Sequence, residues 1–382
     1  MPILFASGYV FCCILFDQLF LVPGSISFNA ILTFLLPYLG CSSAFYLFRS
    51  KSLFWDFDSK GKGSSKELFL FEHIPWLVLF SLFMQIITWI FILLTVDNFN
   101  TVTELFSSLR NASIEMRSIV PIWLSYPNGL CFASFCLAYS FYRCQRKINS
   151  LILLTISVLT IFLNDLQTSG RAGMAFVIFV FLVSSLWDWK VSKIKPFKFL
   201  SGIFIISIFT QLPKILRDDY QSIAHVKILF IEVMRYSFSY LNTLSEFLNR
   251  LPDPNWIGER TFLPFYNLIS RVYPLVERSG IHSIERSEVW GYNNYTIAGD
   301  LLRDFSYLGC FVIPFLVTFA FLFFGTIASR PLNIAITAYF SGWLVFGSIT
   351  NILILGGFLV SLIFLFFLAF LESFYFRKRN LI

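Results

Sequence analysis

Hydrophobic residues occur along this chain in long runs that are separated by shorter polar segments. Ten of these runs have, or approach, the length at which a helix crosses a membrane, which is about 20 residues for a hydrocarbon core ~30 Å thick. They cover residues 3–22, 28–48, 74–96, 119–142, 148–163, 172–189, 199–213, 305–327, 332–349 and 353–376. The pattern therefore predicts an all-α polytopic membrane protein with about ten transmembrane helices.

The composition agrees with this prediction and excludes soluble classes. Of 382 residues, 57% are hydrophobic, only 13% are charged and 49 are Phe. Soluble domains are about 45–50% apolar and about 25% charged. A globule of this size cannot hide so much apolar surface, which excludes a soluble enzyme and a nucleic-acid-binding module. The seven Cys lie in or beside apolar runs, so no disulfide framework is expected.

Lysine and arginine are distributed unevenly between the segments that connect the runs. Sixteen of them fall on one side if successive runs cross the membrane in alternate directions. The short connections on the other side contain only Arg110, Arg117 and Arg171. Because positively charged short loops stay in the cytoplasm, both termini are predicted to be cytoplasmic. The long segment 214–304 then lies outside, and its charge does not affect the assignment, because long loops translocate regardless of charge.

The two sides also differ in the kind of positive residue. The cytoplasmic set has ten Lys and six Arg, whereas the external set has two Lys and eleven Arg. Membrane topology requires only positive charge, which Lys and Arg supply equally. The planar guanidinium group of Arg, in addition, binds phosphate through two parallel hydrogen bonds. The bias indicates a phosphate or diphosphate ligand at the external membrane surface. The alternative is that these arginines pair with the eleven acidic residues of segment 214–304.

The external segment is much longer than a connection between packed helices requires, and such loops are commonly functional. It divides the chain into an N-terminal bundle of seven spans over 1–213, a loop over 214–304, and three spans with a short basic tail over 305–382. Apolar residues at helical spacing over 222–249 predict an amphipathic helix on the membrane face. Aromatic residues alternate with arginines over 256–274, which is typical of an interfacial belt and also suits sugar rings.

Three short elements lie at the external ends of the sixth and eighth runs. They are 168–173 (TSGRAG), 291–296 (GYNNYT) and 300–309 (DLLRDFSYLG). Together with the runs and the large loop in the C-terminal half, they resemble the Wzy-type O-antigen (oligosaccharide repeat-unit) polymerases. Such proteins often carry an Asn-x-Tyr-Thr element followed by Asp-Phe-Gly and a further Gly. Residues 293–296 fit this pattern, while Ser306 stands where Gly is usual.

The resemblance implies a metal-independent glycosyltransferase of the GT-C class that needs no cofactor. It would act in the bacterial inner membrane, with its active face in the periplasm. The growing chain would move from undecaprenyl diphosphate onto the non-reducing end of a new lipid-linked unit. The implied partners are the undecaprenyl-diphosphate-linked oligosaccharide, membrane lipids and a chain-length regulator of the same pathway, with no nucleic acid.

Arg171 is the sharpest catalytic candidate. A lipid diphosphate gains negative charge as the sugar C1–O bond breaks, so positioned cations are the main catalytic need. Arg171 is predicted to begin a helix, where free N–H groups and the helix dipole favour an anion. Gly170 and Gly173 would let phosphate approach the backbone closely. The alternative is that Arg171 only anchors a helix end at the interface.

Further cations are candidates for binding the diphosphate. Arg278, Arg286 and Arg303 lie close to the matched motifs, and each could instead pair with a neighbouring carboxylate. The resemblance also assigns Asn294 and Tyr295 to substrate binding.

The acceptor hydroxyl can be assisted by a general base. Asp304 is the first candidate and shares a predicted helix face with Asp300, four residues before it. Glu288 and His282 are alternatives in the loop. Asp304 could instead be a helix-start charge that stabilises the dipole, and His282 a solvated loop residue. No cluster of His or Cys predicts a metal site.

Two rival functions remain open. An O-antigen ligase of the same fold class usually carries a His-Asn pair near the end of the large loop, where this chain has Tyr292 and Asn293. A flippase or transporter for lipid-linked sugars tends to show internal repeats and charged residues at mid-membrane. No repeat is visible, and Asp17 is the one clear acid within an apolar run.

Overall fold

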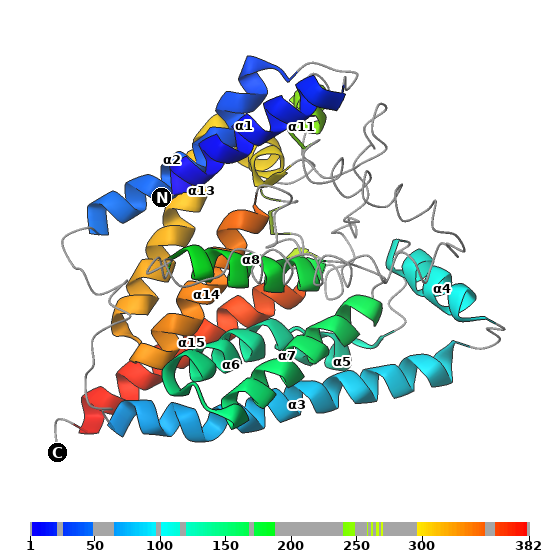
Figure 1. Cartoon of the computed structure of the whole chain (residues 1–382), viewed down its shortest axis with the longest axis vertical. Helices are drawn as coiled ribbons and strands as arrows, with labels where there is room; N and C mark the ends of the chain where they lie inside the picture. The colour runs from blue at the N-terminus through cyan, green and yellow to red at the C-terminus, as the bar shows by residue number, and fades with distance from the viewer. Residues whose placement is uncertain are drawn as a thin grey trace. The chain divides into compact units, whose positions relative to one another are not determined.

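Figure 1 shows a computed structural model of the chain. The residues that it describes are 2–20, 26–48, 65–96, 101–114, 120–167, 172–187, 240–248, 258, 261–262, 265–266, 269, 296–347 and 356–379. The predicted span 199–213 and most of the predicted external loop lie outside these residues.

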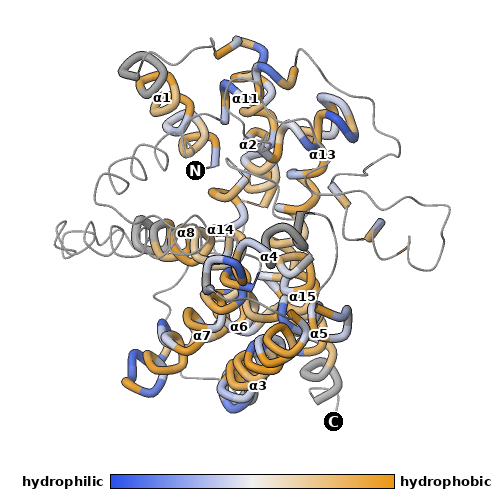
Figure 2. Tube along the Cα trace, turned by 90° about the vertical axis from the view of Figure 1, so that its right-hand side faces the viewer, coloured by the Kyte–Doolittle hydropathy of each residue, from blue (hydrophilic) through white to orange (hydrophobic). Residues whose placement is uncertain are grey.

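The described part of the chain is helical and contains no strand. Five of its helices are long and apolar enough to cross a membrane: Phe28–Phe48, Glu72–Thr95, Ile148–Gln167, Thr296–Ile327 and Gly357–Phe374. Figure 2 shows hydrophobic residues along most of the length of α3, α7 and α15. The protein is therefore a helical multi-pass membrane protein, as the hydrophobic pattern predicted. The number of ten crossings, the GT-C fold and the external position of the loop stay predictions.

The helix bounds follow most of the predicted runs closely. The helices that each cover one run are α1 (Pro2–Phe20), α2 (Phe28–Phe48), α3 (Ser65–Thr95), α7 (Ile148–Gln167), α8 (Ala172–Trp187), α13 (Thr296–Ile327), α14 (Arg330–Phe346) and α15 (Gly356–Arg379). A shorter helix, α4 (Val102–Ile114), lies between runs. Its first turn is closed by a capping box, in which Thr101 Oγ1 accepts the N–H of Glu104 and the Glu104 carboxylate accepts the N–H of Thr101.

The predicted run 119–142 is wrong as one continuous helix. It forms two helices, α5 (Ile122–Asn128) and α6 (Cys131–Gln145). Between them, Gly129 and Leu130 donate their N–H groups to carbonyls only three residues earlier, at 3.0 Å each. Pro127 and Gly129 account for the break, because proline interrupts helical hydrogen bonding and glycine is a poor helix former.

The break is closed by α15. The hydroxyl of Ser361 donates to the carbonyl of Gly129 at 2.5 Å and accepts the N–H of Ala133 at 2.8 Å. A methyl group on Gly129 would lie 2.6 Å from Cα of Gly357, so the two backbones touch where both residues are glycine. Small residues and side-chain hydrogen bonds are the usual means of packing helices in lipid.

The chain divides into two compact units, each built from segments far apart in sequence. Unit 1 comprises Met1–Lys51, Gln221–Leu322 and Trp343–Leu355, and unit 2 comprises Ser52–Tyr220, Phe323–Gly342 and Gly356–Ile382. The boundaries of these units differ from those of the predicted segments 1–213, 214–304 and 305–382. The separate roles of those segments stay a prediction.

In unit 1, α1 and α2 pack side by side, and α11 (Tyr240–Leu248) packs against α2. The hydroxyl of Ser245 in α11 accepts the N–H of Ser27 at 2.9 Å. Tyr240, Leu241 and Leu244 are fully buried. The part of the predicted amphipathic helix 222–249 that is described is thus buried in the protein, and the rest lies outside the described residues.

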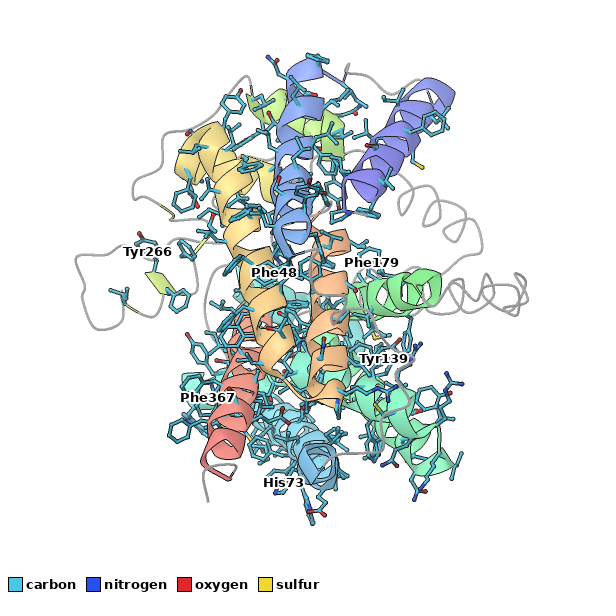
Figure 3. All side chains as sticks on the ribbon, turned by 90° about the vertical axis from the view of Figure 1, so that its left-hand side faces the viewer. Phe48, His73, Tyr139, Phe179, Tyr266 and Phe367 are labelled. Atoms are coloured by element: carbon cyan, nitrogen blue, oxygen red, sulfur yellow. The ribbon has the colours of Figure 1, made fainter. Side chains whose placement is uncertain are left out.

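Unit 2 has a core of α3, α6 and α7, with α15 packed on α6. The α6–α7 hairpin turns at Arg146, which has a left-handed conformation (φ 50°), and the next N–H, of Lys147, is capped by the hydroxyl of Ser150 at 3.1 Å. Rings fill the interior, with Phe132 stacked on Phe358 at 3.8 Å between centroids. In contrast, Phe367 of α15 is half exposed, as expected of a side chain that faces lipid (Figure 3).

Candidate functional site

Helix α13 of unit 1 is broken at Ser306. This residue has φ 59° and ψ −169° inside an otherwise helical stretch. Only glycine adopts that conformation without strain. The stretch that follows, 307–327, is about 31 Å long at 1.5 Å per residue and is by itself sufficient to cross a hydrocarbon core. The preceding stretch, 296–305, is therefore a separate half-helix at the mouth of the span.

The half-helix begins at Thr296, the last residue of the matched GYNNYT element. Thr296 is fully buried, has φ 64°, and its hydroxyl accepts the N–H of Ala298 at 3.2 Å. The N–H of Ile297 is bonded to the carbonyl of Gly347 at 3.0 Å. The first N–H groups of a helix have no partner within the helix, and two of them are bonded here to other groups of the protein.

Asp304 lies at the end of the half-helix, two residues before the break. It is 5% exposed, and its Oδ2 accepts the N–H of Thr261 at 2.6 Å. The break at Ser306 places Asp304 directly before the start of the spanning stretch 307–327, so its interpretation as a helix-start charge stays a prediction. Its carboxylate also ties a segment 43 residues away to the mouth of the span. Its role as a general base stays a prediction.

The segment that Asp304 holds is a turn around Gly258 and Phe262. The N–H of Phe262 is bonded to the carbonyl of Gly258 at 2.8 Å, and the ring of Phe262 meets that of Phe305 edge-on at 6.0 Å. Gly258 has φ 77°, and a methyl group there would lie 2.8 Å from the Phe262 ring and 2.9 Å from the Phe305 ring. Glycine is required here by both conformation and space.

The other candidates on α13 lie beside Asp304. Asp300 is buried and lies one turn before Asp304 on the same face, as the spacing predicted. Arg303 is half-buried in the same half-helix. The half-helix therefore concentrates two carboxylates and one guanidinium group directly before the break.

A further buried carboxylate, which was not predicted from the sequence, lies in unit 2. Asp165 is 3% exposed at the end of α7, and its two oxygens accept the N–H groups of Gly173 at 2.9 Å and Met174 at 2.7 Å. It therefore caps the start of α8, where the anion site was predicted. A methyl group on Gly173 would lie 2.6 Å from Ile161 and 2.8 Å from the Asp165 carboxylate, so this glycine is needed for close packing.

This cap limits how the predicted phosphate site at the start of α8 can work. The N–H groups of Gly173 and Met174 are already bonded to a carboxylate, so phosphate binding through Gly173 would require Asp165 to be displaced. Gly170 and Arg171 lie outside the described residues. Their roles stay predictions, as do those of Arg278, His282, Arg286, Glu288, Asn294 and Tyr295, which also lie outside.

Unit 2 also contains a buried polar network. Gln85 donates to the carbonyl of Asn128 and to the side chain of Asn164 at 3.4 Å each. Gln167 donates to Gln85 at 2.6 Å, and Asn128 donates to Thr88 at 2.7 Å. The network joins α3 and α7 to the break between α5 and α6. The polar residues at positions 81, 85 and 88 of the third run, which share a helix face, were a usable signal for it.

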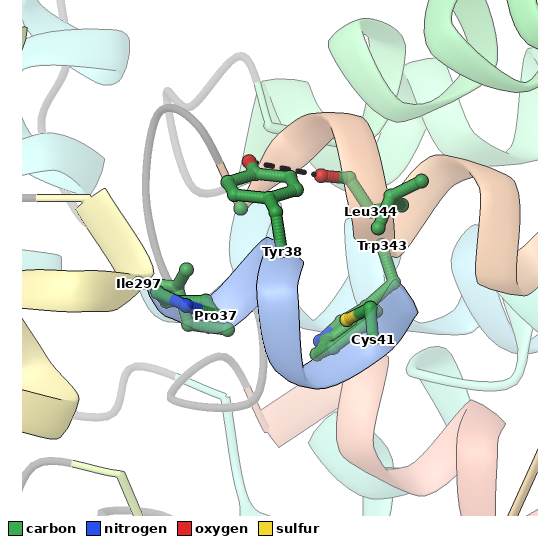
Figure 4. A pocket seen from close by; sticks show the side chains of 7 residues that line it. Pro37, Tyr38, Cys41, Ile297, Trp343 and Leu344 are labelled. Atoms are coloured by element: carbon green, nitrogen blue, oxygen red, sulfur yellow. Dashed lines mark hydrogen bonds between the residues drawn. The ribbon is translucent and has the colours of Figure 1, made fainter. Parts of the chain in front are cut away.

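A small cavity lies among the described residues of unit 1, and the acid groups of the described residues form no metal site. A cavity of about 10 Å³ in unit 1 lies between α2, α13 and α14, where the hydroxyl of Tyr38 donates to the carbonyl of Leu344 at 3.2 Å (Figure 4). It has room for about one water molecule. Among the described residues, no group of three His, Cys, Asp or Glu could hold a metal ion.

Comparison with known proteins adds no family assignment. No protein-family model matches this chain, and no curated protein or solved structure is significantly similar to it.

Proposed function

We propose that this protein polymerises undecaprenyl-diphosphate-linked oligosaccharide repeat units into a polysaccharide at the periplasmic face of the bacterial inner membrane. The observation that carries the proposal is the excess of arginine, eleven against two Lys, in the segments of this multi-pass protein that are predicted to be external. Guanidinium groups recognise a diphosphate at the membrane surface through paired hydrogen bonds. The ammonium group of Lys recognises it less specifically.

In the proposed reaction, a hydroxyl of the incoming unit forms a bond to C1 of the sugar at the reducing end of the growing chain. The bond from C1 to the diphosphate breaks, and undecaprenyl diphosphate leaves with the electron pair. The acceptor proton goes to a carboxylate or to water. No metal or cofactor is required, because arginines stabilise the charge that develops on the leaving group.

The described geometry of α13 supports a site at its N-terminal end. Discontinuous helices at a membrane boundary are common where substrates bind, because they expose backbone groups and helix ends there. Asp304 and Asp300 are buried beside the break at Ser306, with Arg303 between them. In this proposal, Arg303 contacts the diphosphate and Asp304 either accepts the proton or holds the loop.

The residues outside the described part take the remaining roles. Arg171, with Gly170, binds the leaving diphosphate, and Arg278 and Arg286 bind further phosphate or carbohydrate oxygens. Asn294 and Tyr295 position the sugar, and Glu288 and His282 are the alternative bases. The partners are the lipid-linked oligosaccharide, membrane lipids and a chain-length regulator.

A deletion strain tests the function directly. Without a polymerase, lipid A core should carry at most one repeat unit on a gel, because ligation continues. Complete absence of attached units would instead support a ligase of the same fold class. An unchanged ladder would exclude both functions.

Arg171 tests the mechanism. Arg171→Ala should abolish or sharply shorten the polymer, because a charged hydrogen bond to phosphate contributes about 1.5–3 kcal/mol, and more if it strengthens in the transition state. Arg171→Lys should be partly active, since the charge stays and the bidentate geometry is lost. Arg110→Ala, in another external segment, is the matched control. Normal polymer from Arg171→Ala at wild-type protein level would leave Arg171 only as a helix anchor.

One observation favours the second candidate function, a transporter for lipid-linked oligosaccharides. The break between α5 and α6 is lined by buried Gln85, Thr88 and Asn128, and polar groups at a helix break are typical of transporters. A transporter would move lipid-linked units across vesicle membranes without lengthening them. Chain growth by purified protein from lipid-linked units already on the correct face would exclude this alternative.

A further inference from the structure

The turn held by Asp304 has an apolar outer face. Phe262, Phe265 and Ile269 are 38%, 42% and 45% exposed. Their spacing of three and then four residues places them on one face of a helical turn, and Phe265 and Tyr266 both donate their N–H groups to the carbonyl of Phe262. Gly258 and Thr261, at the start of the turn, are buried. A turn that faces water would bury its apolar side chains and expose its polar ones.

The sequence around this turn has the composition of a segment at a lipid surface. Ten uncharged residues, 261–270, lie between Arg260 and Arg271, and they include Phe262, Phe265 and Tyr266, of which Tyr266 is labelled in Figure 3. Aromatic residues gather where lipid headgroups meet acyl chains, and flanking arginines reach the phosphates.

The turn also lies beside the part of α13 that directly precedes the apolar stretch 307–327. Two contacts fix it there, the bond from Thr261 to Asp304 and the ring contact of Phe262 with Phe305. The next residues of α13, Tyr307 and Leu308, are 54% and 72% exposed and begin the apolar stretch 307–327. Through the contact of Phe262 with Phe305, the turn thus lies within unit 1 close to the start of this exposed apolar stretch.

We propose that the turn carrying Phe262, Phe265 and Ile269 inserts the last two among lipid acyl chains at the membrane interface, and that Asp304 holds it there. The partner is the membrane itself, in the leaflet at the N-terminal end of 307–327. This inference does not depend on the proposed enzymatic function. It makes the mouth of α13 a surface at which a lipid-linked molecule meets the protein without leaving the bilayer.

Photo-crosslinking of the full-length protein in lipid nanodiscs tests the insertion. A benzophenone amino acid replaces Phe265 or Ile269, and lipid adducts are measured by mass spectrometry. Leu316, a lipid-exposed position of α13, is the positive control, and exposed Thr101 is the water-facing control. Adduct yields at both turn positions should lie within about twofold of that at Leu316 and about fivefold above that at Thr101, as expected for an inserted apolar face. Yields as low as at Thr101, or crosslinks only to the protein's own chain, would overturn the insertion.

Two substitutions test the role of Asp304. Asp304→Asn keeps a carbonyl oxygen that can accept the N–H of Thr261, so the adduct yield at position 265 should stay unchanged. Asp304→Ala removes the acceptor, and the yield should fall about threefold or more as the turn is released. An unchanged adduct at Leu316 in the same variant shows that the span is intact. If the adduct yield at position 265 is the same in Asp304→Ala as in Asp304→Asn, Asp304 does not hold the turn.

Discussion

Asp165 of unit 2 and Asp304 of unit 1 are both buried carboxylates that accept backbone N–H groups, but they act over different distances along the chain. Asp165 binds groups eight and nine residues ahead and joins two consecutive helices. Asp304 binds a group 43 residues before it and joins a loop to a helix. Closing the longer loop costs about 1.5 kcal/mol more in chain entropy, by the logarithmic dependence on loop length. We therefore expect Asp165 to contribute to the stability of the whole unit and Asp304 to control a segment that can open locally.

The largest effect on stability is expected for Asp165→Ala. It leaves two buried N–H groups without an acceptor, each of which costs about 1–3 kcal/mol. The midpoint of thermal unfolding of purified protein in detergent should fall by about 5 °C or more. Asp165→Asn retains one acceptor oxygen and should lie between the alanine variant and the wild type. A wild-type midpoint for the alanine variant would show that the cap at α8 contributes nothing to stability.

Asp304→Ala should have a smaller effect on thermal unfolding and a more local one. Hydrogen exchange at Thr261 and Phe262 should increase, because the bond from Thr261 to Asp304, worth about 1–3 kcal/mol, is lost. Asp304→Asn then separates holding from proton transfer. If Asp304 is a base, the asparagine variant makes no polymer although the turn exchanges as slowly as in the wild type. Full-length polymer from that variant would restrict Asp304 to its structural role and direct attention to Glu288 and His282.

Gly258→Ala tests the packing of the turn against α13 by a change in the turn itself. Alanine at φ 77° is strained, and its methyl group would meet the rings of Phe262 and Phe305, so a loss of about 1–2 kcal/mol is expected. The measurement is hydrogen exchange of the turn. Gly8→Ala is a matched control, because Gly8 lies in α1 with nothing within 4 Å of the added carbon. If both variants exchange like the wild type, the turn does not depend on the glycine.

Ser306→Gly should have the smallest effect, and in the opposite direction. Glycine adopts the conformation of Ser306 without strain, and the relief of about 1–3 kcal/mol is partly offset by the greater freedom of glycine in the unfolded chain. A net gain of about 1 kcal/mol should raise the unfolding midpoint slightly, by an amount that Ser306→Ala does not reproduce. A lower midpoint for the glycine variant would mean that the serine hydroxyl, rather than the backbone conformation, matters at the break.

Most helices of the described part could be predicted from hydrophobic runs alone. The run 28–48 has the same bounds as α2, because lipid imposes length and apolarity on each span independently of its neighbours. The break between α5 and α6 was missed although the sequence contains a signal for it. Pro127, Asn128 and Gly129 together are a turn sequence, and the surrounding apolar residues obscured it.

The candidate site could be predicted only in part, because its contacts depend on pairs of residues that no local pattern relates. Asp300 and Asp304 share a helix face as their spacing required, but nothing in the sequence links Asp304 to Thr261. Asp165 was missed for the same reason, since its partners are backbone groups of the next helix. Ser306 was visible as a departure from the pattern that the sequence otherwise resembles, and the structure shows that this residue has a left-handed backbone conformation.

The closure of the α5–α6 break by Ser361 has a consequence for biosynthesis. A ribosome delivers residues 122–145 to the membrane more than 200 positions before residue 361. Until α15 has been synthesised, the carbonyl of Gly129 and the N–H of Ala133 lack this hydroxyl, which is a costly state for backbone groups in lipid. Assembly of unit 2 is therefore completed only after α15 enters the membrane, and a chain that stops before residue 356 should be recognised by membrane proteases as unfinished.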